Sequence, residues 1–174
     1  MIKVASAFAL LLAIPVLPVM ASAPVKETSD TPVLATDPLT AVEAIYSDDM
    51  KPSANGLPMT QRLESLFLLE RDHLEASGEP IGRIDFDWTV NGQDASISMV
   101  DVTAVDVPLR DFGDAAVDQF ERRIVTARFM NFDSEQIIRY YWVKQRNGWH
   151  LDDVTGQGED SMTWTLSLLL GYGG

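Results

Sequence analysis

Cysteine is absent from this sequence of 174 residues, and histidine occurs only twice. Without cysteine the chain can form no disulfide, no thiolate metal site and no thiol nucleophile, and it has no cysteine to carry a lipid after the N-terminal segment. A metal site with two histidine ligands would require His73 and His150 to meet, and nothing near His73 has the spacing of metal ligands. We therefore expect no metal and no other cofactor.

Basic residues are also scarce. Lysine and arginine number 13 against 26 aspartates and glutamates, which gives a net charge of −13 at pH 7. Binding to nucleic acid or to anionic lipid depends on Lys and Arg side chains that neutralise phosphate, so the sequence predicts neither. An acidic surface favours solubility and a basic protein partner. Hydrophobic residues make up 46% of the chain, a fraction typical of a folded globular protein.

Familiar catalytic motifs are missing as well. Neither Gly-x-Ser-x-Gly nor Ser-x-x-Lys occurs, and Asp111-Phe112-Gly113 matches the kinase magnesium triplet without the other kinase loops. The stretch from Asp87 through Asn91-Gly92 resembles part of a calcium loop, but its twelfth position is Ser98 where a glutamate is required. A structural turn is the better interpretation. We assign no catalytic residue and favour a non-enzymatic protein over an enzyme.

No apolar run reaches the roughly 20 residues that a membrane-spanning helix needs. Residues 1–23 instead combine Lys3, a short apolar segment broken by prolines, and the small residues Ala21-Ser22-Ala23. This pattern predicts a cleaved secretory signal and a periplasmic or secreted mature protein with no membrane span. Cleavage after Ala23 would leave Pro24 first, so cleavage after Ala21 is an alternative. Residues 24–36 lack apolar periodicity and are expected to form a flexible tether.

Residues 37–174 are expected to form a single α+β domain. Asp37 and Pro38 open a first helix over 38–50, and Thr60 caps a second over 61–77 that stops at Gly78. The residues Leu63, Leu66, Phe67, Glu70 and Leu74 fall near one stripe of the second helix, and all of them except Glu70 should face a sheet. A short amphipathic helix is predicted over 160–170.

Between these helices the apolar period changes to two, starting near Ile84. Strands are predicted over 96–107, 119–132, 135–145 and 149–154, with a slip in the alternation after Met99 and a loop over 108–118. Asn147-Gly148 predicts a type I′ turn at the centre of the main hairpin. The order of helices followed by strands favours an antiparallel sheet over a parallel βαβ arrangement.

Two polar patterns suggest candidate sites. Nearly half of the basic residues lie between Arg122 and Arg146, where they either form cross-strand ion pairs or surround an anionic ligand held by Arg139 beside Tyr141. Asp85 with Asp87, and Asp152 with Asp153, are paired carboxylates. An aspartate that points into an apolar cavity could act as a general base, but capping or turn aspartates are the favoured interpretation.

Two stretches resemble the DUF3828 family. Ile84-Asp-Phe-Asp-Trp-Thr-Val-Asn-Gly-Gln-Asp94 is similar to its Phe-Asp…Asn-x-Gln-Asp signature, and Gly148-Trp-His-Leu-Asp-Asp-Val154 to its closing Gly-Trp-x-Ile-Asp-Asp-Ile. The resemblance covers about residues 37–172. It implies an NTF2-like cone, in which N-terminal helices pack in a curved antiparallel sheet, often leave a pocket and are followed by a short C-terminal helix. Family members are commonly exported bacterial proteins without an assigned activity, so no catalytic residue is carried over.

These observations favour a periplasmic, non-enzymatic module that binds a small ligand or an unknown protein partner. The alternatives are a small-molecule enzyme or carrier that uses the pocket, and, because some relatives resemble them, an immunity protein against a secreted toxin. A homodimer is possible, since NTF2-like sheets often dimerise through their open face. Asp85, Asp87, Gln93 and Asp94 are expected to satisfy free backbone groups, and Trp142 and Trp149 to close the base of the core. The candidate pocket or motif residues are Asp85, Asp87, Trp88, Gln93, Asp94, Arg128, Arg139, Tyr141, Trp149 and Asp152.

Overall fold

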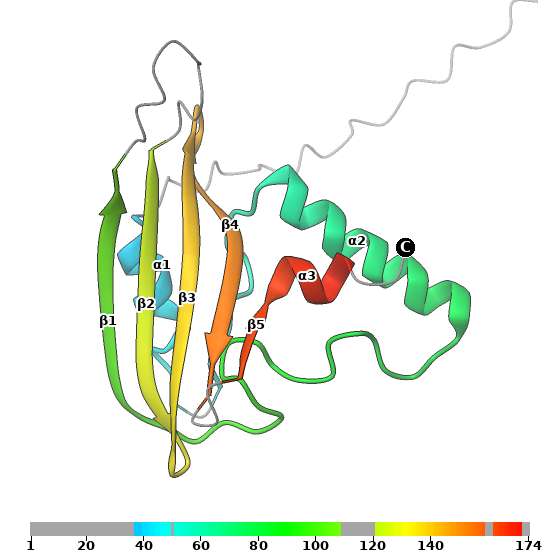
Figure 1. Ribbon diagram of the computed structural model, residues 1–174, viewed down its shortest axis with the longest axis horizontal. Coiled ribbons are helices and arrows are strands. Elements are labelled where there is room, and N and C mark those ends of the chain that lie inside the picture. The colour runs from blue at the N-terminus through cyan, green and yellow to red at the C-terminus, as the bar shows by residue number, and fades with distance from the viewer. Residues whose placement is uncertain (1–36, 50, 109–120, 159–161, 172–174) are drawn as a thin grey trace, which may run out of the picture. The chain divides into compact units, whose positions relative to one another are not determined.

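A computed structural model describes residues 37–49, 51–108, 121–158 and 162–171 of the chain (Figure 1). These residues form three helices and a five-stranded antiparallel sheet, which confirms the α+β class. The expected signal over 1–23 and the tether over 24–36 lie outside the described residues, as does most of the predicted loop over 108–118.

Both N-terminal helices begin where the local capping signals place them. In α1 (Pro38–Ile45) the Asp37 carboxylate accepts the N–H of Leu39 at 2.9 Å. In α2 (Gln61–Ser77) the Thr60 hydroxyl accepts the N–H of Leu63 at 3.3 Å, and Gly78 ends the helix with φ +69°. The prediction for α2 is confirmed, whereas α1 ends five residues earlier than expected.

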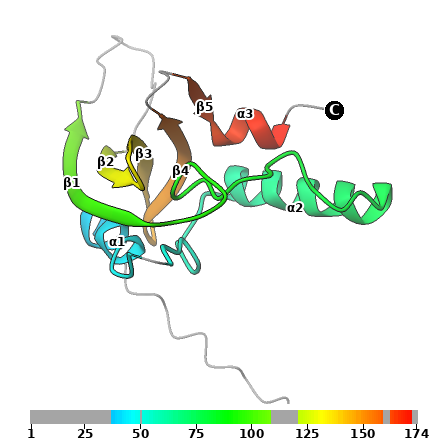
Figure 2. The ribbon, with the colours of Figure 1, turned by 90° about the horizontal axis from the view of Figure 1, so that it is seen from below.

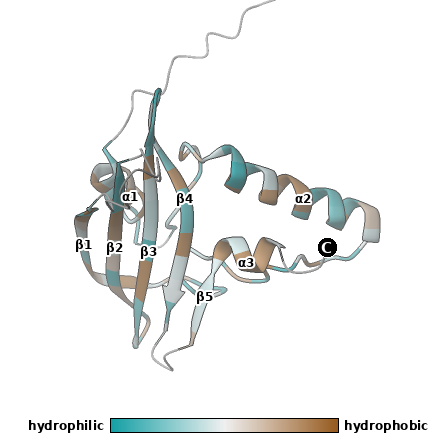
Figure 3. Ribbon diagram, turned by 45° about the horizontal axis from the view of Figure 1, so that its top comes forward, coloured by the Kyte–Doolittle hydropathy of each residue, from teal (hydrophilic) through white to brown (hydrophobic). Residues whose placement is uncertain are grey.

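The sheet has the strand order β1-β2-β3-β4-β5. Its strands are β1 (Ile97–Val107), β2 (Arg122–Asn131), β3 (Ser134–Gln145), β4 (Gly148–Gln157) and β5 (Thr163–Thr165). Alternate residues of the central strands point to one buried face, where α1 packs on β1 and β2 (Figure 2). Apolar residues accordingly lie along β2, β3 and β4, while α2 mixes polar and apolar turns (Figure 3).

The main hairpin joins β3 and β4, as predicted, but its turn differs from the type I′ turn expected over Asn147-Gly148. Gln145 pairs with Gly148, so the two loop residues are Arg146 and Asn147. Neither has a positive φ, and Gly148 takes the left-handed position instead, with φ +123°. The Asn-Gly signal therefore located the turn to within one residue. The error arises because glycine can adopt a positive φ either within the two-residue loop or at the position directly after it.

Residues 84–95 form no strand, which agrees with the prediction that the strands begin near residue 96 and that the stretch from Asp87 to Gly92 is a turn. Their only pairing in the described chain is an isolated bridge between Asp87 and Gly92. The predicted slip after Met99 is confirmed as a β-bulge, since the register between β1 and β2 shifts between Ser98 and Asp101.

The C-terminal helix is shorter than the predicted span of 160–170. Residues Thr163–Thr165 form β5 and pair with β4, and α3 covers only Leu166–Gly171. Trp164 lies over Gly156, at which a Cβ atom would overlap the indole ring. Its indole Nε1–H donates to the Asn91 side-chain oxygen at 2.6 Å. These long-range contacts override the local amphipathic pattern.

The apolar stripe of α2 is predicted to face a sheet, but the helix does not lie flat on it. Figures 1 and 2 show that α2 extends outward from the β4 side, and it packs mainly against α3. Glu70 on its apolar stripe is buried because its carboxylate accepts the Arg83 N–H at 2.5 Å and lies 3.3 Å from the Arg83 guanidinium. Arg83 also donates to the Leu170 carbonyl at 2.9 Å, which joins α2 to α3.

Candidate binding cleft

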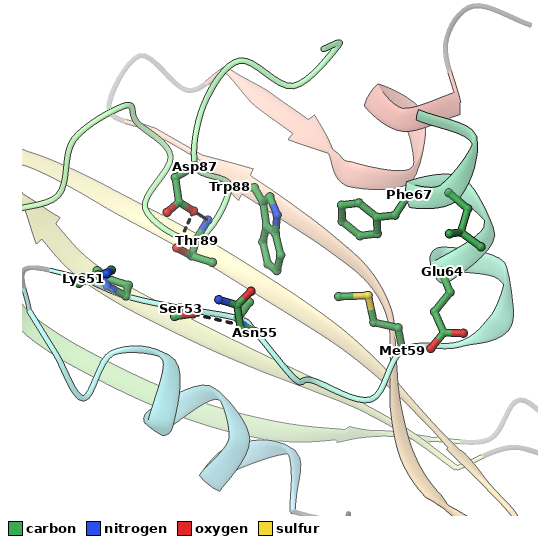
Figure 4. Close-up of a pocket in the computed structure, with 12 residues that line it drawn as sticks. Lys51, Ser53, Asn55, Met59, Glu64, Phe67, Asp87, Trp88 and Thr89 are labelled. Carbon is green, nitrogen blue, oxygen red and sulfur yellow. Dashed lines mark hydrogen bonds between the residues drawn. The ribbon is translucent and has the colours of Figure 1, made fainter. Parts of the chain in front are cut away.

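A cleft of about 720 Å³ opens between the segment over 51–59, the first half of α2 and the turn over 87–89 (Figure 4). The rings of Trp88 and Phe67 flank the thioether of Met59 in it. Six of the twelve lining residues are apolar and six are polar or charged. The lining residues are Lys51, Pro52, Ser53, Ala54, Asn55, Met59, Glu64, Phe67, Leu68, Asp87, Trp88 and Thr89.

One wall is fixed to the edge of β4. The Thr60 N–H donates to the Leu151 carbonyl at 2.9 Å, and the Leu151 N–H donates to the Pro58 carbonyl at 2.8 Å. Met59 thus forms a short parallel bridge with Leu151. Directly after it, α2 places Glu64, Phe67 and Leu68 at positions i, i+3 and i+4, which share one side of a helix.

The opposite wall is the turn that carries Trp88. The Asp87 carboxylate accepts the Thr89 N–H at 2.8 Å and the Thr89 hydroxyl at 2.7 Å, which closes a local turn. Asn91 adopts φ +54°, a conformation that asparagine tolerates, and the Asp87 N–H donates to the Gly92 carbonyl at 2.8 Å. The turn interpretation of this stretch is confirmed.

Two buried tyrosines support this wall from below. The Tyr46 hydroxyl donates to the Thr89 carbonyl at 2.9 Å and lies 2.7 Å from the Tyr140 hydroxyl. Burial raises the pKa of both hydroxyls above the ordinary value near 10, and the Asp87 carboxylate raises it further. Both tyrosines therefore stay neutral near pH 7. The Tyr140 ring centroid lies 6.3 Å from that of Trp88.

Several polar groups of the cleft remain open to a ligand. The side chains of Glu64 and Lys51 and the indole N–H of Trp88 make no hydrogen bond within the described chain. Glu64 and Asp87 supply two carboxylates against the single ammonium of Lys51. An apolar cavity with a few uncommitted polar groups is the usual architecture of a small-molecule site.

Of the ten candidate residues, the cleft contains only Asp87 and Trp88. Asp85, Gln93 and Asp94 are exposed, and their side chains make no hydrogen bond within the described ranges, so only Asp87 satisfies backbone groups as expected. The signature stretch from Ile84 to Asp94 identified the turn that forms one wall of the cleft. It gave no signal for Phe67 and Met59, which the sequence pattern assigns to the core or to a loop.

Tyr141 and Asp152 line a second cavity of about 370 Å³ on the sheet, which Arg139 does not line. Arg139 is half-buried and pairs with Thr126 and Thr155 in the ladder, and Arg128 is exposed. The structure thus places Arg139 and Tyr141 two residues apart on β3 without bringing both into one cavity.

Of the basic residues near the main hairpin, Arg123 and Lys144 form ion pairs with described residues. The Arg123 guanidinium lies 2.7 Å from the Asp106 carboxylate and 2.6 Å from that of Asp37. It also stacks on the half-buried Trp149 ring, 5.0 Å from its centroid, and Trp149 in turn packs against the core that contains Trp142. These contacts support the cross-strand pairing interpretation.

The adjacent aspartates of β4 both anchor helices. A register shift after Tyr141 allows both carboxylates to reach outward from the strand. Asp152 accepts the Thr60 hydroxyl at 3.0 Å. Asp153 accepts the Ser167 N–H at 3.1 Å and the Ser167 hydroxyl at 2.5 Å, at the start of α3. The capping interpretation is thereby supported over the general-base one.

Among the described residues, no three His, Cys, Asp or Glu side chains are grouped so that they could hold a metal ion. None of the helices in the described part of the chain combines the length and the apolar character that crossing a membrane requires. Comparison of the chain with known protein families, with curated proteins and with solved structures gives no match.

Proposed function

We propose that the mature chain is an exported, non-enzymatic binding module whose cleft takes a small ligand with an apolar, ring-sized body and a cationic group. The observation that carries this proposal is the pairing of the Trp88 and Phe67 rings with the uncommitted carboxylate of Glu64 in one cleft. Aromatic rings and a nearby carboxylate are the groups that recognise organic cations in water. The excess of carboxylates over ammonium groups favours the same ligand charge.

The state of the neighbouring polar groups supports binding over catalysis. The Asp87 carboxylate accepts two hydrogen bonds, both from Thr89. One carboxylate oxygen of Asp87 is therefore committed to the turn. Tyr46 and Tyr140 have raised pKa values and remain neutral, so neither hydroxyl is suited to remove a proton near pH 7. Binding requires only that these groups hold the walls in place.

We further propose that the fold is an NTF2-like cone of the DUF3828 type. The positions of the two signature stretches support this assignment. Residues 84–94 form the wall that carries Trp88, and residues 148–154 form the part of β4 to which both α2 and α3 are tied. Each signature stretch therefore has a structural role, and that role would account for the residues that make up the signature.

Export is proposed from residues 1–23, and the mass of the mature chain tests it. Cleavage after Ala21 would leave Ser22 first, and cleavage after Ala23 would leave Pro24 first. The two products differ by one Ser and one Ala residue, which mass spectrometry separates. Finding the intact precursor in the periplasmic fraction would contradict the cleaved signal.

Native mass spectrometry of the mature protein, purified from the periplasm of its own host, tests ligand binding. We expect an added mass that is lost in Trp88→Ala and in Phe67→Ala. Trp149→Ala is the control, because that ring stacks on Arg123 outside the cleft. Retention of the same ligand by all three variants would contradict the proposed site.

Charge variants test the ligand class with aromatic ammonium ions as probes. Glu64→Gln should weaken binding about two- to fivefold and Lys51→Met should strengthen it by a similar factor, because each removes one screened charge interaction. Calorimetric titration measures both. Equal effects of the same sign would show that charge does not select the ligand.

A further inference from the structure

Two bulky apolar residues occupy backbone positions that usually belong to glycine. Met99 and Phe132 both have φ +54°, in the left-handed region where a β-carbon crowds the backbone. Both side chains are large and apolar and yet lie on the surface, since 83% of Met99 and 59% of Phe132 is exposed. Asn91 is the third residue with this φ among the described residues, and asparagine is a common occupant.

Met99 lies in the β-bulge of β1. Ser98 pairs with Met130 and Asp101 with Arg128, so Met99 and Val100 together face the single residue Phe129. When the first residue of such a bulge is left-handed, it is normally glycine, which has no side chain to clash. Methionine here gains no burial in return, because its side chain points into solvent.

Phe132 opens the two-residue turn between β2 and β3. Asn131 pairs with Ser134, which leaves Phe132 and Asp133 as the loop. A positive φ at the first loop residue of a hairpin is again a glycine position. The turn is held firmly, since the Phe132 N–H donates to the Ser96 carbonyl at 2.9 Å and the buried Asn131 side chain accepts the Ser96 N–H at 2.9 Å.

The two residues lie at the same end of the sheet. Ser96 bonds to Phe132 and lies three residues before Met99, and Val100 beside Met99 is exposed as well. We name Met99, Val100 and Phe132 the Met99–Phe132 surface. Two exposed carboxylates adjoin it directly along the chain, since Asp101 follows Val100 and Asp133 follows Phe132. The exposed carboxylate of Asp94 lies two residues before Ser96.

We propose that the Met99–Phe132 surface is a docking site for a partner protein that presents an apolar socket with a basic rim. Backbone strain is retained in proteins chiefly where function requires it, and here it holds two apolar side chains outward on a fixed base. Exposed apolar anchors ringed by charge are the usual centre of a protein interface. The acidic border selects the basic rim of the partner.

The strain is tested by stability. Met99→Gly and Phe132→Gly should raise the unfolding midpoint by about 2–4 °C each, because glycine relieves the left-handed backbone. Met99→Ala keeps the β-carbon, and so it should give no such rise. A fall in the midpoint for both glycine variants would remove the premise of the proposal.

Docking is tested with a photoreactive benzoylphenylalanine placed at position 132 of the full chain in its own host. The same group at Leu168, which is 58% exposed on α3, is the matched control. We expect a single basic polypeptide to be cross-linked at 132 and not at 168. Once purified, it should bind the wild-type protein in a salt-sensitive manner and bind Phe132→Gly and Met99→Gly at least about tenfold more weakly.

Several outcomes would overturn the docking proposal. These are the absence of a cross-link at 132, equal cross-linking at 168, a product that is a second copy of this chain, and unchanged binding of the purified partner by the glycine variants. None of them bears on the cleft, whose ligand is tested separately through Trp88 and Phe67.

Discussion

The hydroxyls of Tyr46 and Tyr140 lie 2.7 Å apart in the buried centre of the protein, although 94 residues separate them along the chain. Tyr46 donates its single hydroxyl hydrogen to the Thr89 carbonyl. Tyr140 must therefore donate to Tyr46, and the two hydroxyls form an ordered chain that ends on the turn carrying Trp88. This chain connects α1, β3 and one wall of the cleft.

The order of donation predicts unequal effects of two similar substitutions. Tyr46→Phe leaves both the Thr89 carbonyl and the Tyr140 hydroxyl without partners, and it should lower the free energy of unfolding by about 2–3 kcal/mol. Tyr140→Phe leaves the Tyr46–Thr89 bond intact and should cost about 1 kcal/mol. Urea denaturation measures both. An equal or larger cost for Tyr140→Phe would contradict the assigned direction.

The same pair predicts instability at alkaline pH. The pKa values of Tyr46 and Tyr140 are raised in the folded protein, so the unfolded chain loses these protons first as pH rises. Their contribution to stability is complete below about pH 10 and falls above it, by up to about 1.4 kcal/mol per pH unit for each tyrosine. Urea denaturation between about pH 9 and about pH 11 should give a shallower decline in Tyr140→Phe than in the wild type. Parallel declines would contradict the assignment.

The two adjacent aspartates of β4 should differ in their structural importance. Asp153 accepts hydrogen bonds from Ser167 and from the Val154 N–H, and its side chain is 18% exposed. Asp153→Ala should lower the free energy of unfolding by about 2–3 kcal/mol. Asp152 is 35% exposed and pairs with Arg62, which is 49% exposed, so Asp152→Ala should cost about 1 kcal/mol or less. Thermal and urea unfolding of the two variants provide the comparison, and a reversed order would contradict it.

Sequence reasoning succeeded where the decisive contacts are local. The starts of α1 and α2 depend on Asp37 and Thr60, which bond to backbone two and three residues away. The turn over 87–92 closes on itself in the same way. Capping and turn propensities act within one turn of chain, so the sequence displays them directly.

Sequence reasoning failed where contacts between residues far apart in the chain determine the structure. Trp164 fits the periodicity of a helix, but the bare backbone of Gly156 and the side chain of Asn91, 73 residues away, hold it in β5. The cleft was only half predictable for the same reason. Trp88 belongs to a local motif, whereas Phe67 faces it only because α2 is tied to the distant strand β4.

The buried ion pair between Glu70 and Arg83 predicts a strong thermodynamic coupling. Glu70→Leu removes the carboxylate that accepts the Arg83 N–H and lies 3.3 Å from the Arg83 guanidinium, which is 21% exposed, and it should cost about 3 kcal/mol. The double variant Glu70→Leu/Arg83→Met replaces both charges by apolar groups, and it should be more stable than the sum of the single losses. A double-mutant cycle in urea measures the difference. Additive losses would show that the two residues do not depend on each other.

Gly156 should tolerate no larger residue, because the Trp164 ring occupies the place of a β-carbon. Gly156→Ala forces either β4 or Trp164 to move, which separates β5 from the sheet and breaks the bond between Trp164 and Asn91. We expect a loss of about 2–4 kcal/mol in unfolding free energy and a changed tryptophan fluorescence. Gly171→Ala is the control, since the nearest atom to its β-carbon would be 3.9 Å away on Leu66. Equal stability of the two variants would show that Trp164 does not pack on Gly156 in solution.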